Sequence, residues 1–231
     1  MSTGAGLFVS FEGGEGAGKS TQIRRLADHL RRTGLDVITT REPGGSAGAE
    51  ALRHVLLSGA AEPFGIRMEA LLFAAARNDH VETVIRPALA KGFVVLCDRF
   101  MDSSRVYQGV TGNLEVEFID ALERIAVNGV VPDLTLVLDL PAAAGLERAR
   151  GRLAAEASGE AAPDRFEREE LDTHEKRRQA FLDIAAADPK RCRVIDADRT
   201  VGEIAESIAE AVQPLLARRK PVSQPESVGA E

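Results

Sequence analysis

The sequence predicts an α/β fold in which one mostly parallel, five-stranded sheet carries helices on both faces. One observation is a set of short apolar runs, such as residues 7–11 and 93–97, which are typical of strands covered on both faces. The second is that these runs alternate with segments whose apolar residues recur at helical spacing, as Ile23, Leu26 and Leu30 do. The length of 231 residues favours one such domain over two.

Strands and helices are expected to alternate along the whole chain. The first strand leads into a helix that carries Ile23 to Leu30 and ends at Gly34. The five expected strands cover residues 7–11, 36–40, 93–97, 134–140 and 193–195. The later helices are expected at residues 47–57, 67–76, 81–90, 114–127, 145–155, 168–187 and 201–216, with the second and third of these either separate or continuous.

Two segments depart from this regular pattern. Residues 154–163 are rich in Ala, Glu and Gly without an apolar period, which predicts a mobile loop within a lid at about 148–166. Residues 218–231 are polar and contain two prolines, so we expect a disordered C-terminal tail. Residues 1–217 are then expected to form the single domain.

Composition and charge exclude several classes of protein. The net charge of -7 argues against binding to long nucleic acid, because duplex affinity comes mainly from Lys and Arg at phosphates. The two cysteines, Cys97 and Cys192, lie in apolar or strand-like runs and are expected to be buried thiols in a reducing compartment. No apolar run approaches the roughly 20 residues of a membrane helix, and the first residues lack a basic segment followed by an apolar stretch, so we expect no signal peptide. We expect a cytoplasmic protein.

A phosphate-binding loop follows the first strand. Residues 13–20 fit the pattern G-x-x-x-x-G-K-[ST], with a strand before and a helix after them. The glycines let backbone N–H groups turn towards phosphate oxygens, and the helix N-terminus adds positive partial charge. Lys19 is expected at the β- and γ-phosphates and Ser20 at Mg²⁺. The fold is therefore expected to be P-loop NTPase-like, with ATP held by Gly13, Gly14, Glu15, Gly16, Ala17, Gly18, Lys19, Ser20 and Thr21.

The end of the third strand favours a kinase over other P-loop proteins. The chain has no Asn-Lys-x-Asp segment, which a GTPase would need to read guanine. Asp98-Arg99 instead follows the third strand, at the sheet edge where open α/β sheets bind ligands. Asp98 could hold a Mg²⁺-bound water, and Arg99 could grip a second phosphate bidentately.

Several sequence blocks carry a family resemblance. In order along the chain they are Phe11-Glu12-Gly13, Thr40-Arg41-Glu42-Pro43-Gly44-Gly45, Phe73 with Arg77, Asp98-Arg99 with Ser103-Ser104, Tyr107-Gln108-Gly109, Pro132-Asp133-Leu134-Thr135 through Asp139, and Asp164-Arg165-Phe166-Glu167. With these blocks the sequence resembles the bacterial thymidylate kinases, from about residue 6 to about 216. Phe100 departs from the pattern, since the family more often has Tyr or His there.

The resemblance implies an activity and a set of ligand roles. The activity is ATP-Mg-dependent phosphorylation of dTMP to dTDP, by direct transfer to the acceptor phosphate, in dTTP biosynthesis. Phe73 would stack on thymine, Arg77 would bond a thymine carbonyl, and Arg99 would hold the monophosphate. Glu15 would approach the 3′-hydroxyl and Tyr107 the sugar. The remaining acceptor residues would be Arg41, Glu42, Pro43, Ser103, Ser104 and Gln108, with Arg53 a weaker candidate. The family is usually a homodimer, and an apolar helix such as residues 68–76 could contribute.

A catalytic cation is expected from the lid. Some thymidylate kinases carry an arginine inside the P-loop, at the position that Gly16 occupies here. The dense basic cluster lies at Arg148, Arg150 and Arg152, and residues four apart share a helix face. That spacing favours Arg148 and Arg152, and the match to the bacterial lid pattern favours Arg152 as the catalytic one.

Three alternatives stay open at this point. One is a kinase for uridylate, cytidylate or adenylate, although those lack the Arg-Glu-Pro-Gly-Gly and Tyr-Gln-Gly blocks as a set. Another is a deoxynucleoside kinase, whose hydroxyl acceptor needs a carboxylate base, for which Glu12 or Asp98 could serve. The third is a non-catalytic nucleotide-binding module.

Overall fold

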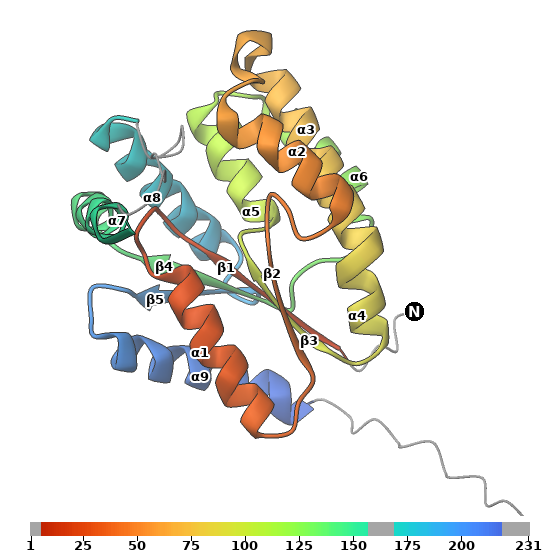
Figure 1. Cartoon of the computed structure of the whole chain (residues 1–231), viewed down its shortest axis with the longest axis vertical. Coiled ribbons are helices and arrows are strands. Elements are labelled where there is room, and N and C mark those ends of the chain that lie inside the picture. Colours follow the sequence, from red (N-terminus) through yellow and green to blue (C-terminus); the bar gives the residue numbers. More distant parts are fainter. Residues whose placement is uncertain (1–5, 157–168, 219–231) are drawn as a thin grey trace, which may run out of the picture.

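A computed structural model describes residues 6–156 and 169–218 and contains the predicted sheet. The strands are β1 (Leu7–Glu12), β2 (Val37–Arg41), β3 (Val94–Asp98), β4 (Leu134–Asp139) and β5 (Cys192–Asp196). They form one five-stranded sheet in the order β2-β3-β1-β4-β5, and every neighbouring pair is parallel (Figure 1). The predicted fold class is therefore confirmed.

The helices connect the strands as parallel crossovers require. They are α1 (Lys19–Arg32), α2 (Ala47–Ser58), α3 (Gly65–His80), α4 (Arg86–Ala90), α5 (Met101–Ser104), α6 (Val116–Val127), α7 (Ala142–Glu156), α8 (Leu171–Ala187) and α9 (Val201–Arg218). A 3₁₀ turn spans Glu62–Phe64, and π-helical segments span Val81–Ile85 and Arg105–Thr111. The first π-helical segment joins α3 to α4, so the two helices expected at 67–76 and 81–90 are one continuous helical run.

The strands are apolar because both sheet faces are covered. Every residue of β1 is buried. Leu7, Val9 and Phe11 pack in the cluster that includes α1 and α9, whereas Phe8 packs in the cluster on the opposite face. This alternation follows from the two-residue period of a strand. Figure 1 shows α1 and α9 together on one side of the sheet and α8 on the other.

One helical region was not predicted. Residues 101–111 form α5 and the π-helical segment, although Asp102, Ser103, Ser104 and Arg105 have no apolar period. Tertiary contacts, described below, stabilise this segment instead of local propensity. Parts of two predicted regions, residues 157–168 of the lid and 219–231 of the tail, lie outside the described residues. Among the helices of residues 6–156 and 169–218, none is long and apolar enough to cross a membrane.

Candidate active site

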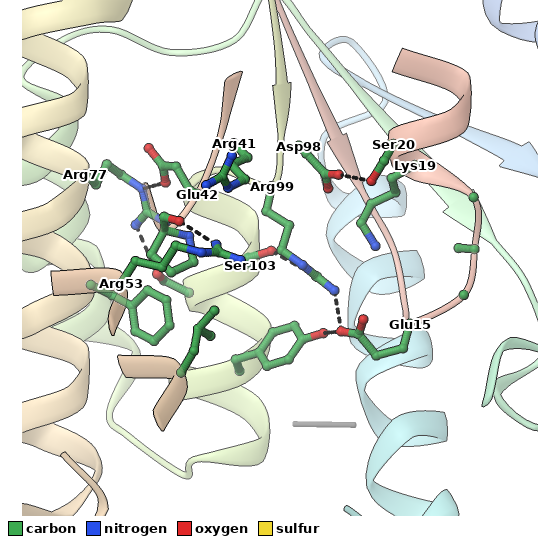
Figure 2. A pocket seen from close by; sticks show the side chains of 18 of the residues that line it. Glu15, Lys19, Ser20, Arg41, Glu42, Arg53, Arg77, Asp98, Arg99 and Ser103 are labelled. Atoms are coloured by element: carbon green, nitrogen blue, oxygen red, sulfur yellow. Dashed lines mark hydrogen bonds and ion pairs between the residues drawn. The ribbon is translucent and has the colours of Figure 1, made fainter. Parts of the chain in front are cut away.

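A pocket of about 470 Å³ lies at the carboxyl edge of the sheet. Because β1 pairs with β3 and β3 with β2, the segments that follow these three strands meet at this edge. Figure 2 shows the labelled side chains converging on the pocket from these segments and from the neighbouring helices. The pocket is lined by Glu15, Gly16, Ala17, Gly18, Lys19, Ser20, Thr21, Arg24, Arg41, Glu42, Pro43, Arg53, Leu57, Phe73, Arg77, Asp98, Arg99, Ser103, Ser104, Tyr107 and Gln108.

The P-loop joins β1 to α1. The ammonium of Lys19 bends back over the loop and donates to the carbonyl oxygens of Gly13 (3.1 Å) and Gly14 (2.9 Å). Burial lowers the pKa of this ammonium, and the nearby Arg99 guanidinium lowers it too. Gly18 has a φ of 88° immediately before α1, a left-handed conformation that glycine adopts at little cost. The unpaired N–H groups at the start of α1 add donors for phosphate oxygens.

Gly16 packs directly against α7. A Cβ atom at Gly16 would collide with the carbonyl oxygen of Gly145, and one at Gly145 would collide with the carbonyl oxygen of Glu15. The P-loop and α7 therefore touch backbone to backbone. An arginine at position 16 would have to displace α7, so the absence of a P-loop arginine is a steric requirement of this packing.

Ser20 and Asp98 offer oxygen atoms suited to magnesium. The hydroxyl of Ser20 donates to Asp98 Oδ2 at 2.7 Å, which joins the first turn of α1 to the end of β3 (Figure 2). Mg²⁺ prefers hard oxygen ligands and usually keeps waters while it binds one or two protein oxygens and substrate phosphates. One hydroxyl and one carboxylate beside a P-loop fit that requirement.

Arg99 is a second cation beside Lys19, and both donate to the carbonyl oxygen of Gly13. Its backbone φ is 66°, a left-handed value uncommon outside glycine, and such strain is often kept at functional sites. Its guanidinium donates to Glu15 Oε1 at 2.5 Å and to the carbonyl of Gly13 at 3.2 Å. Burial alone would raise the pKa of Glu15, but Arg99 and Lys19, with a hydrogen bond from Tyr107, bring it down to about 2. Glu15 is therefore an anion in the neutral range.

Glu12 holds the residues that follow Arg99 in place. Its carboxylate is fully buried and accepts from the backbone N–H of Phe100 (2.8 Å) and the hydroxyl of Ser103 (2.6 Å). Burial, followed by the neighbouring Asp102 carboxylate, raises the pKa of Glu12 to about 8. Glu12 does not line the pocket, so it is not placed to take a proton from a hydroxyl acceptor.

Arg77 is held from three sides. Its Nε donates to Glu42 Oε2 at 2.7 Å, Nη1 to Ser104 Oγ at 3.0 Å, and Nη2 to the carbonyl of Phe100 at 3.0 Å. The other oxygen of Glu42 lies 3.0 Å from His80 Nδ1. These contacts use three of the five N–H donors of the guanidinium, which leaves two that a ligand can accept from.

The aromatic side of the pocket is also built by long-range contacts. The hydroxyl of Tyr107 donates to Glu15 Oε1 at 3.0 Å, and the guanidinium of Arg177 from α8 lies 4.2 Å from the Tyr107 ring centre. Gln108 donates to Glu69 Oε1 at 2.7 Å. Phe73 of α3 lines the same pocket. Every predicted acceptor residue thus lies around one cavity.

Some predictions fall elsewhere, and some lining residues were missed. The guanidinium of Arg148 contacts the carbonyl of Ala197 (3.0 Å) and the carboxylate of Asp198 (3.3 Å), outside the pocket lining. The side chain of Arg152 lies outside the described part of the chain. Sequence reasoning missed Arg24 and Leu57; Arg24 lies four residues after Ser20 on α1, so helical spacing could have indicated it.

The fold and this pocket define a P-loop phosphotransferase, with a triphosphate-binding loop and a second cation, Arg99, that contacts it. The family model described as thymidylate kinase matches residues 11–208. A thymidylate kinase from Afipia carboxidovorans is 52% identical over 218 residues, which are 94% of this chain and 93% of that protein. The chain belongs to the thymidylate kinase family, whose known reaction is the ATP-dependent phosphorylation of dTMP.

Two further relatives agree with this assignment. A thymidylate kinase from Nitrobacter winogradskyi is 53% identical over 207 residues, 90% of this chain and 88% of that protein. The crystal structure of thymidylate kinase from Ehrlichia chaffeensis superposes with a TM-score of 0.71 at 28% identity, over 90% of this chain and 99% of that one. The predicted family and reaction are confirmed, and the three alternatives are set aside.

Proposed function

We propose that the pocket binds both substrates, with ATP on the P-loop and the phosphate of dTMP on Arg99. The observation that carries this proposal is the presence of two cations side by side in one pocket, Lys19 after β1 and Arg99 after the adjacent β3. A single triphosphate site would need only the first. The arrangement suits the transfer of a phosphoryl group between two bound phosphates.

The chemistry requires positioning more than base catalysis. A phosphate monoester has a second pKa near 6, so the acceptor is already mostly dianionic in the neutral range. No general base has to create the nucleophile. The protein has to hold two polyanions in line and offset their repulsion. Lys19, Arg99 and the P-loop amides supply positive charge for this purpose.

Magnesium is the proposed cofactor, held by the Ser20 hydroxyl and, directly or through water, by the Asp98 carboxylate. When bound beside a P-loop, the ion neutralises charge on the β- and γ-phosphates. The hydrogen bond of 2.7 Å between Ser20 and Asp98 supports this assignment, because it places both oxygens on the same side of the loop.

The thymine base is assigned to Phe73 and Arg77. An aromatic face such as Phe73 stacks well on a planar base. Arg77 keeps a fixed orientation through Glu42, so its remaining N–H groups can meet a thymine carbonyl without first being ordered. Glu15 and Tyr107, joined by a hydrogen bond, are assigned to the sugar.

The transition-state cation is assigned to Arg152 of α7, with Arg148 as the secondary candidate. Gly16 has no side chain and packs on Gly145, which supports a cation from outside the P-loop. An arginine supplied in this way is typically worth about 10³–10⁵ in rate. Replacing Arg152 with Ala should therefore lower kcat strongly and change the KM for dTMP little. If neither Arg152→Ala nor Arg148→Ala costs tenfold in kcat, this assignment is wrong.

A coupled assay with ATP-Mg and a panel of monophosphates tests the pocket as a whole. We expect turnover of dTMP to exceed that of uridylate, cytidylate and adenylate, and no turnover of thymidine. In Arg77→Met, the KM for dTMP should rise while the KM for ATP stays nearly unchanged. A rise in the KM for ATP alone would show that the two subsites are assigned the wrong way round.

We also propose that the protein is a homodimer. In α3 and the turn before it, Phe64, Met68 and Leu71 are 70%, 43% and 47% exposed and lie at helical spacing. The adjacent α6 exposes Val116 and Ile125. The exposed apolar stripe formed by Phe64, Met68 and Leu71 supports an interface. Leu71→Glu should reduce the mass measured by light scattering to that of a monomer, whereas Val201→Glu, on α9, should not. An unaltered protein that is already monomeric would contradict the proposal.

We place the enzyme in the cytoplasm. Cys97 and Cys192 are free thiols and both are buried, as expected for a protein of a reducing compartment. Cell fractionation with an antibody to the chain would test the location, and recovery in a secreted fraction would refute it.

A further inference from the structure

Behind the pocket, the carboxylate of Asp102 is the centre of a buried polar cluster. Asp102 is only 1% exposed. The guanidinium of Arg191 donates to both carboxylate oxygens of Asp102, from Nη1 to Oδ2 at 2.5 Å and from Nη2 to Oδ1 at 3.0 Å. Arg105 Nη1 donates to Oδ1 at 3.2 Å. Arg191 Nη1 also donates to Thr135 Oγ1 at 2.7 Å, and Thr135 hydrogen-bonds Ser10 at 2.8 Å. The cluster therefore ties α5 to the sheet.

This cluster and the acceptor pocket share one short element. Asp102 belongs to α5, and the next residue, Ser103, lines the pocket. The hydroxyl of Ser103 donates to Glu12 and accepts from Arg99 at 3.3 Å. The π-helical segment that continues α5 carries Tyr107. A rotation of α5 would consequently move both Ser103 and Tyr107 relative to Arg99.

The element has little stability of its own. A four-residue helix is shorter than a stable nucleus, and π-helical geometry is rare and mostly found at functional sites. Apolar packing alone would leave its rotation weakly defined, whereas a bidentate guanidinium–carboxylate pair adds geometric specificity. Well-packed apolar residues often match or exceed a buried ion pair in stability. Orientation, rather than stability, is therefore what the Asp102–Arg191 pair contributes.

We propose that Asp102 and Arg191 are positioning residues for the acceptor site. Their ion pair fixes the rotation of α5 and the π-helical segment about the helix axis. Ser103 and Tyr107 are thereby oriented towards the bound monophosphate together with Arg99. Arg191 lies in the turn between α8 and β5, 89 residues from Asp102. Neither residue lines the pocket, so both act through α5. The inference rests on the proposed acceptor site.

The test replaces the whole pair with apolar residues. Asp102→Leu combined with Arg191→Met removes one negative and one positive charge together and leaves no unpaired partner between them. We expect the double variant to fold, the KM for dTMP to rise at least tenfold, and the KM for ATP to change less than threefold. The preference for dTMP over its ribose counterpart should also fall. Should the double variant not fold, Asp102→Asn is measured by the same criteria.

Two controls separate positioning from a purely structural role. Ile208→Ala perturbs the core beneath α9, far from α5, and serves as a variant of lowered melting temperature. Asp188→Asn weakens the ion pair between Arg191 Nε and Asp188 Oδ2, which are 2.9 Å apart, and leaves the ion pair between Arg191 and Asp102 in place. Both should keep the KM for dTMP within threefold. If the double variant changes the KM for dTMP no more than these controls do, the positioning role is refuted. Failure of the unaltered enzyme to use dTMP would instead refute the proposed function.

Discussion

Replacing Glu15 with Gln should remove a defined part of the acid dependence of stability. The pKa of Glu15 is about 2, which is about 2.5 below its ordinary value of 4.5. At 1.36 kcal/mol per pKa unit, ionised Glu15 contributes about 3.4 kcal/mol to folding, and about 2–3 kcal/mol after allowance for solvent screening. Its folded-state pKa is lowered, so this contribution is present above pH 4.5 and is lost as the pH falls towards 2. About 1.4 kcal/mol of it should be gone by pH 3.5.

Urea unfolding at pH 7, 5, 4 and 3.5 measures this effect. The unaltered protein should lose more stability between pH 7 and 3.5 than Glu15→Gln does, because other carboxylates titrate equally in both. Glu210→Gln, an exposed change on α9, is the matched control and should follow the unaltered protein. If the curves for Glu15→Gln and the unaltered protein run parallel over this range, the ion pair with Arg99 does not stabilise the fold as argued.

Four further changes probe the two phosphate sites and their support. Lys19→Ala should lower kcat at least tenfold, about 1.4 kcal/mol, in the coupled assay, because the ammonium serves phosphates. Arg99→Ala should raise the KM for dTMP by roughly 30-fold or more, since loss of a desolvated charge partner costs about 2–5 kcal/mol, and should leave ATP-analogue affinity, measured by calorimetry, nearly unchanged. Tyr107→Ala should narrow the ratio of kcat/KM between dTMP and its ribose counterpart, because the ring, in its proposed place at the sugar, would exclude a 2′-hydroxyl. Glu12→Gln should remove a loss of stability that the unaltered protein shows in urea unfolding as the pH rises from about 4.5 to about 8, since a raised folded-state pKa gives a contribution that is fully present below the ordinary pKa and is gone once the folded-state pKa is passed.

Each of these expectations has an opposing result. A Lys19→Ala enzyme that keeps more than a tenth of its kcat contradicts the P-loop assignment. Weakened ATP-analogue binding with unchanged dTMP kinetics in Arg99→Ala would reverse the two subsites. If the ratio of kcat/KM between dTMP and its ribose counterpart is unchanged in Tyr107→Ala, another residue excludes the 2′-hydroxyl. Parallel stability curves for Glu12→Gln and the unaltered protein between pH 4.5 and 8 would mean that folding does not raise the pKa of Glu12.

Much of the fold and of the site could be predicted because the signals are local. The strand-loop-helix context of residues 13–20 lies within one stretch of chain, and the structure has β1 before this loop and α1 after it, as expected. The buried strands were recognisable because parallel strands covered on both faces must be apolar. The blocks at 41–43 and at 98–108 identified the walls of the pocket before any geometry was known. Their meeting at one edge follows from the parallel sheet.

The tertiary structure decided what holds those residues in place. The contact of Tyr107 with Glu15 joins residues 92 apart, and that of Asp102 with Arg191 joins residues 89 apart. No local period encodes such pairs, because they depend on the strand order that brings distant segments together. For the same reason α5 and its π-helical continuation were not predicted, since contacts with remote segments, rather than local helical propensity, decide their conformation. The sequence by itself determined the fold class and the family of this protein, because their signals are local, and only the packing of remote segments determined how the side chains around the pocket are oriented.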